Sequence, residues 1–215
     1  MKTILNTVLL ALILLTSSHF AIGQVSRPVV YKSGNVYHGA FDKFTRPNGF
    51  GTMDFPNGDK YEGEWVKGKY HGKGVYIYAD GGRLEGSWEN GKMVGPGVIY
   101  FPNGDVIEAD FTDGTSQTGK GKFTYANGCV YEGDLVNGVP EGEGKKVWPN
   151  GATYTGQWHK GAMSGQGEYV FENGARYKGS WANGRYNGEG TYTTSTGKVT
   201  HAIYKNGKVE KEIVD

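Results

Sequence analysis

The stretch YEGEWVKGKYHGKGVYIYADGGR at residues 61–83 is followed at once by LEGSWENGKMVGPGVIYFPNGDV at residues 84–106, with glycines, acids and aromatic residues in the same order. Similar units start every 23 or 24 residues along the chain. Repetition at such a period is typical of proteins built from stacked supersecondary units. We therefore divide the chain into seven repeats, at 37–60, 61–83, 84–106, 107–130, 131–153, 154–176 and 177–199.

Each repeat has two halves that read as strands. The first half follows the pattern Y-x-G-x-W, in which alternate residues share one face, so Tyr61, Gly63 and Trp65 point away from Glu62 and Glu64. The second half follows the pattern G-x-G and then alternates aromatic with other residues, which also predicts a strand. Sequences such as PNGD at 56–59 separate the repeats, and their Asn-Gly pair predicts a type I′ hairpin turn.

Short turns between successive strands make each strand the antiparallel neighbour of the next. The predicted fold is all-β: an elongated, twisted, single-layer antiparallel β-meander. Residues 24–36 are expected to form a linker and an N-terminal half-repeat cap, and residues 200–215 a C-terminal half-repeat cap and tail. The glycines of the Y-x-G-x-W pattern are expected to leave room for a neighbouring aromatic ring, because a bare strand glycine is otherwise unfavourable.

Composition and charge exclude two classes of protein. The 215 residues include 37 Gly, 15 Tyr, 9 Phe and 5 Trp, and this wealth of aromatic residues argues against a disordered chain. Lys and Arg number 23 against 22 Asp and Glu, and Lys2 is the only charged residue before position 24, so residues 24–215 are neutral. A neutral chain lacks the basic excess of nucleic-acid binders. Local basic pairs such as Lys145 and Lys146 are interpreted as part of a solvated face.

The first 23 residues have a different character. Lys2 precedes a mostly apolar run from Ile4 to Leu15, and small residues at Ala21 and Gly23 follow it. This arrangement predicts a secretory signal peptide at residues 1–23, cleaved before Gln24. The alternative is a membrane anchor, but the apolar run is shorter than the ~20 residues that span a bilayer. The expected location is therefore the cell envelope, either the periplasm or the extracellular space.

The repeat resembles the MORN repeat (membrane occupation and recognition nexus). The motif Y-E-G-x-W-x-x-G-x-x-x-G-x-G-x-Y-x-Y-x-x-G matches residues 61–83 at nearly every position, and the resemblance extends over residues 30–207. The repeat at 107–130 departs most, with Ile107, Ala109 and Phe111 where Tyr, Gly and Trp are usual. The resemblance implies hairpins stacked into one sheet, and a role as a protein-interaction scaffold or a membrane-lipid contact.

The sequence predicts no catalytic residues, no metal site and no cofactor. Its histidines do not show metal-ligand spacing, and the acidic column of Glu62, Glu85, Glu108 and Glu132 is interpreted as a solvent-exposed row. Cys129, the only cysteine, is interpreted as a small filler residue, with an intermolecular disulfide as the alternative.

A single-layer sheet without a covering helix leaves one question about its aromatic face. Repeated aromatics more often build a core than bind a ligand, yet an uncovered aromatic surface often marks a contact. The predicted function is a non-catalytic protein-interaction scaffold, with envelope glycan or lipid as the alternative ligand and edge-strand pairing as a route to homo-oligomers. The candidate partner-binding residues are Trp65, Trp88, Trp158, Trp181, Tyr61, Tyr154 and Tyr177.

Overall fold

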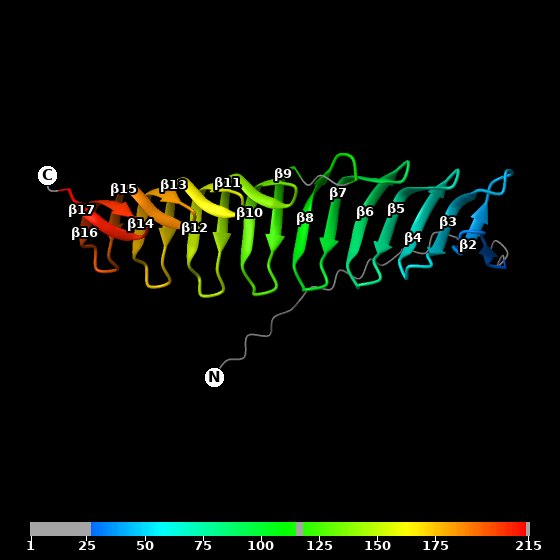
Figure 1. The fold of residues 1–215 in the computed structure, drawn as a ribbon, viewed down its shortest axis with the longest axis horizontal. Coiled ribbons are helices and arrows are strands. Elements are labelled where there is room, and N and C mark those ends of the chain that lie inside the picture. Colours follow the sequence, from blue (N-terminus) through cyan, green and yellow to red (C-terminus); the bar gives the residue numbers. More distant parts are fainter. Residues whose placement is uncertain (1–26, 115–117, 214–215) are drawn as a thin grey trace, which may run out of the picture.

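The computed structural model describes residues 27–114 and 118–213 as one antiparallel sheet of 17 strands. The predicted signal peptide lies outside the described residues. Each strand pairs with the next in sequence, from β1 with β2 to β16 with β17, which confirms the predicted meander. The strands form a long row (Figure 1). They are β1 Val29–Val30, β2 Val36–Phe41, β3 Pro47–Asp54, β4 Lys60–Val66, β5 Lys69–Ile77, β6 Arg83–Glu89, β7 Lys92–Tyr100, β8 Val106–Phe111, β9 Gly119–Thr124, β10 Val130–Val136, β11 Val139–Val147, β12 Thr153–His159, β13 Ala162–Val170, β14 Arg176–Ala182, β15 Arg185–Thr193, β16 Val199–Lys205 and β17 Lys208–Glu212.

The C-terminal tail contributes more than expected, because β17 completes a hairpin with β16. The two edges of the sheet are a two-residue strand, β1, and a strand of alternating charge, β17, whose sequence is KVEKE. Short and charged edges oppose pairing with a second sheet. Edge-to-edge assembly of copies stays a prediction. No helix in the part of the chain that the structure describes is long and apolar enough to cross a membrane.

The turns differ from the predicted ones. The Asn-Gly sequences between repeats are not type I′: in PNGD, Gly58 has a φ of 90°, and its N–H donates to the carbonyl of Phe55. The preceding Pro56 fixes φ near −65°, which suits a type I turn followed by a glycine bulge. The type I′ turns lie within the repeats instead, where residues such as Lys67 (φ 50°) and Gly68 (φ 81°) both have positive φ.

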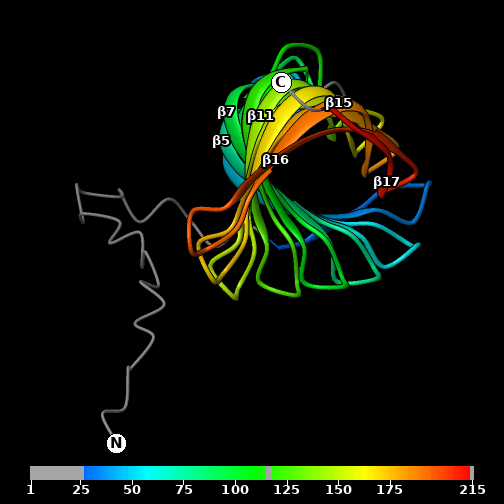
Figure 2. The same cartoon turned by 90° about the vertical axis from the view of Figure 1, so that its left-hand side faces the viewer.

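A bulge bends nearly every hairpin at the same place. In β4 and β5 the register shifts between Gly63 and Glu64, and Gly72 of the facing strand has a φ of 55°. Bulges bend a strand and increase its twist. The Glu64 carboxylate accepts a hydrogen bond of 3.0 Å from the N–H of Lys73 beside the bulge. The end-on view shows strands that arch over a concave inner face (Figure 2).

The inner face carries the core. Each tyrosine of the Y-x-G-x-W pattern lies flat over a facing pair of glycines; a Cβ on Gly74, for example, would collide with the ring of Tyr61. The predicted ring clearance is thus confirmed. Where the tyrosine is absent, the glycine is sometimes absent too, as in Ile107 with Ala109 and Thr200 with Ala202. Tyr–Gly pairing is therefore a packing rule of this sheet.

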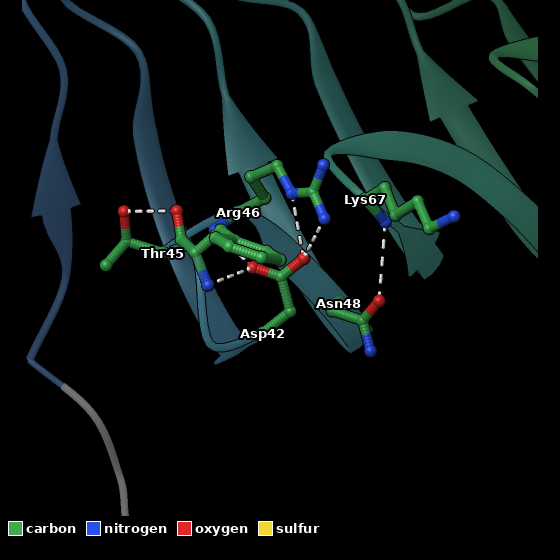
Figure 3. A network of polar contacts seen from close by, with 6 residues as sticks. Asp42, Thr45, Arg46, Asn48 and Lys67 are labelled. Atoms are coloured by element: carbon green, nitrogen blue, oxygen red, sulfur yellow. Dashed lines mark hydrogen bonds and ion pairs between the residues drawn. The ribbon is translucent and has the colours of Figure 1, made fainter.

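The loop between β2 and β3 does not form the type I′ turn. Between β2 and β3, the carboxylate of Asp42 accepts backbone N–H bonds from Phe44 and Arg46, and it forms an ion pair of 2.6 Å with the Arg46 guanidinium (Figure 3). The Arg46 side-chain hydrogen bond is the main cause that lowers the pKa of Asp42. The N–H of Lys67, in the next turn, donates to Asn48 at 3.3 Å, so the two turns are tied together.

Candidate peptide-binding groove

All seven candidate residues lie in the packed interior. The exposed fraction is 3% for Trp65, 6% for Trp88, 4% for Trp158 and 5% for Trp181, and Tyr61, Tyr154 and Tyr177 are fully buried. The expectation that the tryptophans offer an uncovered surface is therefore wrong: the bend places neighbouring rings edge to face, with Tyr154 and Trp158 centroids 5.2 Å apart. Direct binding of a partner through these seven residues stays a prediction, and their observed role is packing.

Another aromatic row is more accessible. We use the term rim row for the aromatic residue that stands three positions before the turn glycine between successive repeats, as Phe55 stands before Gly58 and Tyr78 before Gly81. Tyr78 and Phe101 of this row are 42% and 39% exposed, and the other members are partly buried. Rings of this row contact aromatic rings two residues earlier on the same strand: the ring centroids of Phe123 and Tyr125 are 4.1 Å apart, and those of Tyr169 and Phe171 are 4.7 Å apart. The rim row consists of Phe55, Tyr78, Phe101, Tyr125, Trp148 and Phe171.

The rim row lines the inner groove, by which we mean the concave face between the two rows of turns. A pocket of about 400 Å³ is lined by Tyr78 and Phe101, which precede turns between repeats, and by Leu84, Phe111 and Gly114, the last of which belongs to a loop within a repeat. A second pocket joins Phe55 to Trp65, Asn90 and Gly91 in the same way. Residues from both rows of turns thus line shared hollows, which suit apolar side chains of a bound segment.

The inner groove contains a cation that sequence reasoning placed elsewhere. Lys146 is not part of a solvated face with Lys145: it stands on β11 opposite the buried Tyr131 and Tyr154. Its Nζ lies 4.0 Å from the Tyr125 ring centroid and 5.6 Å from that of Trp148. Burial is the main cause that lowers the pKa of Lys146. The period-two alternation of the strand is the sequence signal for this placement, because adjacent residues such as Lys145 and Lys146 point to opposite faces of the sheet.

The outer face is polar and ion-paired, as the sequence predicts for the glutamate column. Glu85 pairs with Arg83 at 2.8 Å, and Glu108 pairs with Lys122 at 3.2 Å. Cys129 is 4% exposed, in keeping with a filler role. Among residues 27–114 and 118–213, no group of three or more His, Cys, Asp or Glu side chains could hold a metal ion.

Two polar side chains near one type I′ turn form a contact that the sequence did not predict. His159 Nδ1 is 2.8 Å from Glu141 Oε1, and the other oxygen of Glu141 accepts a bond from the N–H of Lys160. The Lys160 backbone bond is the main cause that lowers the pKa of Glu141, and the His159 contact adds to it. Both side chains are substantially exposed, and the contact fixes the turn to the neighbouring strand.

The fold and groove define a single-layer β-hairpin repeat protein. The MORN repeat family model matches residues 37–60, 61–83, 85–106, 117–130, 131–153, 154–176 and 177–199. The chain belongs to the MORN-repeat family. The matches agree with the seven repeats read from the sequence, except that the divergent fourth repeat is matched only from residue 117 and the third from residue 85.

Solved structures resemble the fold at low sequence identity. The wild-type TCP10 domain of Danio rerio CPAP has a TM-score of 0.51 and 16% identity, over 88% of this chain and 98% of that one. The G-box domain of the microcephaly protein CPAP has a TM-score of 0.51 and 17% identity, over 88% of this chain and 99% of that one. At this identity the likeness concerns the fold alone. Curated protein sequences give no match to the chain.

Proposed function

We propose that this protein is an exported, non-catalytic scaffold that binds a segment of a partner protein in its inner groove. The observation that carries the proposal is the rim row, which leaves half-exposed rings beside pockets in an otherwise packed sheet. Accessible aromatic surface is enriched at interaction sites. The tryptophan and tyrosine columns act indirectly, by holding the groove in shape.

Glycan or lipid is the second candidate ligand. The half-exposed rings Tyr78 and Phe101 could stack on a sugar as well as on a peptide side chain. Lipid is less favoured, because residues 24–215 carry equal numbers of basic and acidic residues and so lack a net attraction for anionic headgroups.

The test compares a groove variant with a variant of the outer face. Phe50 is 52% exposed and is paired across the sheet with Glu64, whose side chain is on the face opposite Tyr61 and Trp65. Phe50→Ser therefore removes an exposed ring outside the groove. The tagged full-length protein, the double variant Tyr78→Ser/Phe101→Ser and Phe50→Ser are each cross-linked in the cells that make them and purified. Circular dichroism confirms that each variant is folded.

A stoichiometric protein that is retained by Phe50→Ser and lost from Tyr78→Ser/Phe101→Ser would support the proposal. A partner bound equally by all three forms would contradict groove binding. Glycan or lipid in place of protein in the eluate would favour the second candidate. The same preparation tests export, since the intact mass of envelope-derived protein should correspond to a chain that begins at Gln24.

A further inference from the structure

Lys146 interrupts an apolar column of the inner groove. The other residues at the same place in the repeat are Met53, Tyr76, Ile99, Phe123, Tyr169 and Tyr192, all apolar or aromatic. Lys146 is flanked on the neighbouring strands by Tyr131 and Tyr154, whose rings are fully buried. The groove therefore places an ammonium group within an aromatic wall, where a charge loses much of its hydration.

The rings around Lys146 hold its ammonium group in position. The Nζ atom lies over Tyr125 at 4.0 Å and within 5.6 Å of Trp148, and both rings belong to the rim row. A cation over an aromatic face is weakly attracted to it. The ring faces are much weaker hydrogen-bond acceptors than a carboxylate, so the three N–H donors of the ammonium group have no strong acceptor among these rings.

Another repeat has an acidic side chain beside this column, but the repeat that contains Lys146 has an uncharged residue at the corresponding position. In an earlier repeat, the Tyr76 hydroxyl donates a hydrogen bond of 2.7 Å to Asp59, which precedes it by 17 residues. The residue 17 positions before Lys146 is Cys129. Lys146 makes no ion pair with any carboxylate of the described residues. The charge of Asp105 helps to raise the pKa of Tyr125, but the Asp105 carboxylate accepts a hydrogen bond of 2.7 Å from the N–H of Ala126 and does not pair with Lys146.

We propose that Lys146 binds the carboxylate of an Asp or Glu side chain carried by the partner segment, while apolar side chains of that segment occupy the groove on either side. The proposal rests on the proposed function and adds the charge of the partner. A half-buried ammonium without a partner is unfavourable, and a carboxylate supplied by the ligand would form charge-assisted hydrogen bonds with it. Neutral segments would bind more weakly, because they leave the ammonium unpaired.

The experiment selects random peptides displayed on phage against the immobilised full-length protein and measures the affinity of those enriched. Four forms are compared: the native protein, Lys146→Met, Lys146→Arg and Lys145→Met. Methionine is already present in this column at Met53, so Lys146→Met should fold. Lys145 is the adjacent exposed lysine on the outer face and is the matched control for the loss of one charge.

The expected consensus has one acidic residue between apolar residues. Changing that Glu to Gln in the peptide should weaken binding about tenfold or more, as should Lys146→Met, because either change removes one charge-assisted contact. Lys146→Arg and Lys145→Met should retain most of the affinity. Enriched peptides without an acid, or equal binding to Lys146→Met, would overturn the role of Lys146 while leaving groove binding intact. If the native protein selects no peptide that binds in the inner groove, both the role of Lys146 and the proposed function are overturned.

Discussion

The indole Nε1 of Trp158 donates a hydrogen bond of 3.0 Å to the backbone carbonyl of Gly144, across the boundary between two repeats. The same bond joins Trp65 to Gly51, Trp88 to Gly74 and Trp181 to Gly167, each over a separation of 14 residues. Gly144 lies where the tyrosine ring needs a bare backbone, so one glycine serves the core of its own repeat and the tryptophan of the next. Neighbouring repeats are thus coupled by hydrogen bonding as well as by packing.

Trp158→Phe should separate these two contributions. It keeps an aromatic ring but leaves the partly buried carbonyl of Gly144 without the indole donor, so we expect a loss of about 1–2 kcal/mol in the free energy of unfolding. Trp158→Ala also creates a cavity and should cost about 3–5 kcal/mol. Denaturant unfolding followed by circular dichroism measures both. Phe111, which occupies this column naturally, shows that phenylalanine fits, and a Trp158→Phe protein as stable as the native one would refute the bond's contribution.

The Tyr–Gly rule predicts a strong coupling between Tyr177 and Gly190. The three atoms nearest to a Cβ on Gly190 would all belong to the Tyr177 side chain. Gly190→Ala alone should therefore destabilise the protein by about 1–3 kcal/mol through overpacking. In a Tyr177→Leu background the same change should cost much less, because the ring is gone. A double-mutant cycle measures the coupling, and additive effects of the two substitutions would show that the ring does not require the glycine.

Much of this architecture can be predicted from the repeat alone. The period gives the hairpins, alternation gives the shared face of Tyr61, Gly63 and Trp65, and the glycine column reveals the need for ring clearance. The bend cannot be obtained in the same way, because it depends on where the bulge falls between Gly63 and Glu64 in the paired strands. That bend decides that the tryptophans are covered.

The groove was harder to predict for the same reason. Strand alternation puts the side chains of Lys145 and Lys146 on opposite faces of the sheet, but two adjacent lysines are also typical of a solvent-exposed surface. Only the three-dimensional position of the Tyr125 and Trp148 rings shows that the Lys146 ammonium lies among aromatic groups. The predicted turn type is wrong because the two residues before the turn glycine, such as Pro56 and Asn57, form the centre of the turn, and only Gly58 takes a positive φ. The turns at 126–129 and 172–175 have no proline and form the same bond from the glycine N–H.

The type I′ turns offer a stabilising substitution. Lys67 and Lys160 adopt a φ of 50° at the first central position of this turn, whereas the residue there is an asparagine in four other hairpins, at Asn90, Asn137, Asn183 and Asn206. Asparagine tolerates this left-handed conformation better than lysine does. Lys67→Asn should raise the free energy of unfolding by about 0.5–1 kcal/mol, since the backbone N–H that donates to Asn48 is kept. Lys69→Asn, outside the positive-φ positions, is the control, and an equal gain there would point to charge rather than backbone conformation.

The buried tyrosines should make the protein sensitive to alkali. Burial is the main cause that raises the pKa of Tyr37 and of Tyr177 to about 12 from an ordinary value of 10.0. The folded state keeps these hydroxyls neutral, whereas the unfolded state can ionise them above pH ~10. Their contribution to stability is therefore complete below pH ~10 and is lost as the pH rises through about 12.

This loss can be followed by titrating tyrosinate absorbance and sheet content together. The accessible tyrosines should ionise first with the sheet intact, and the buried column should ionise together with a cooperative loss of β-structure. Tyr177→Phe removes one ionisable group from the column while keeping its ring, so the alkaline transition of that variant should move to higher pH relative to its stability at neutral pH. Complete ionisation of all tyrosines while the sheet remains folded would contradict the buried placement of this column.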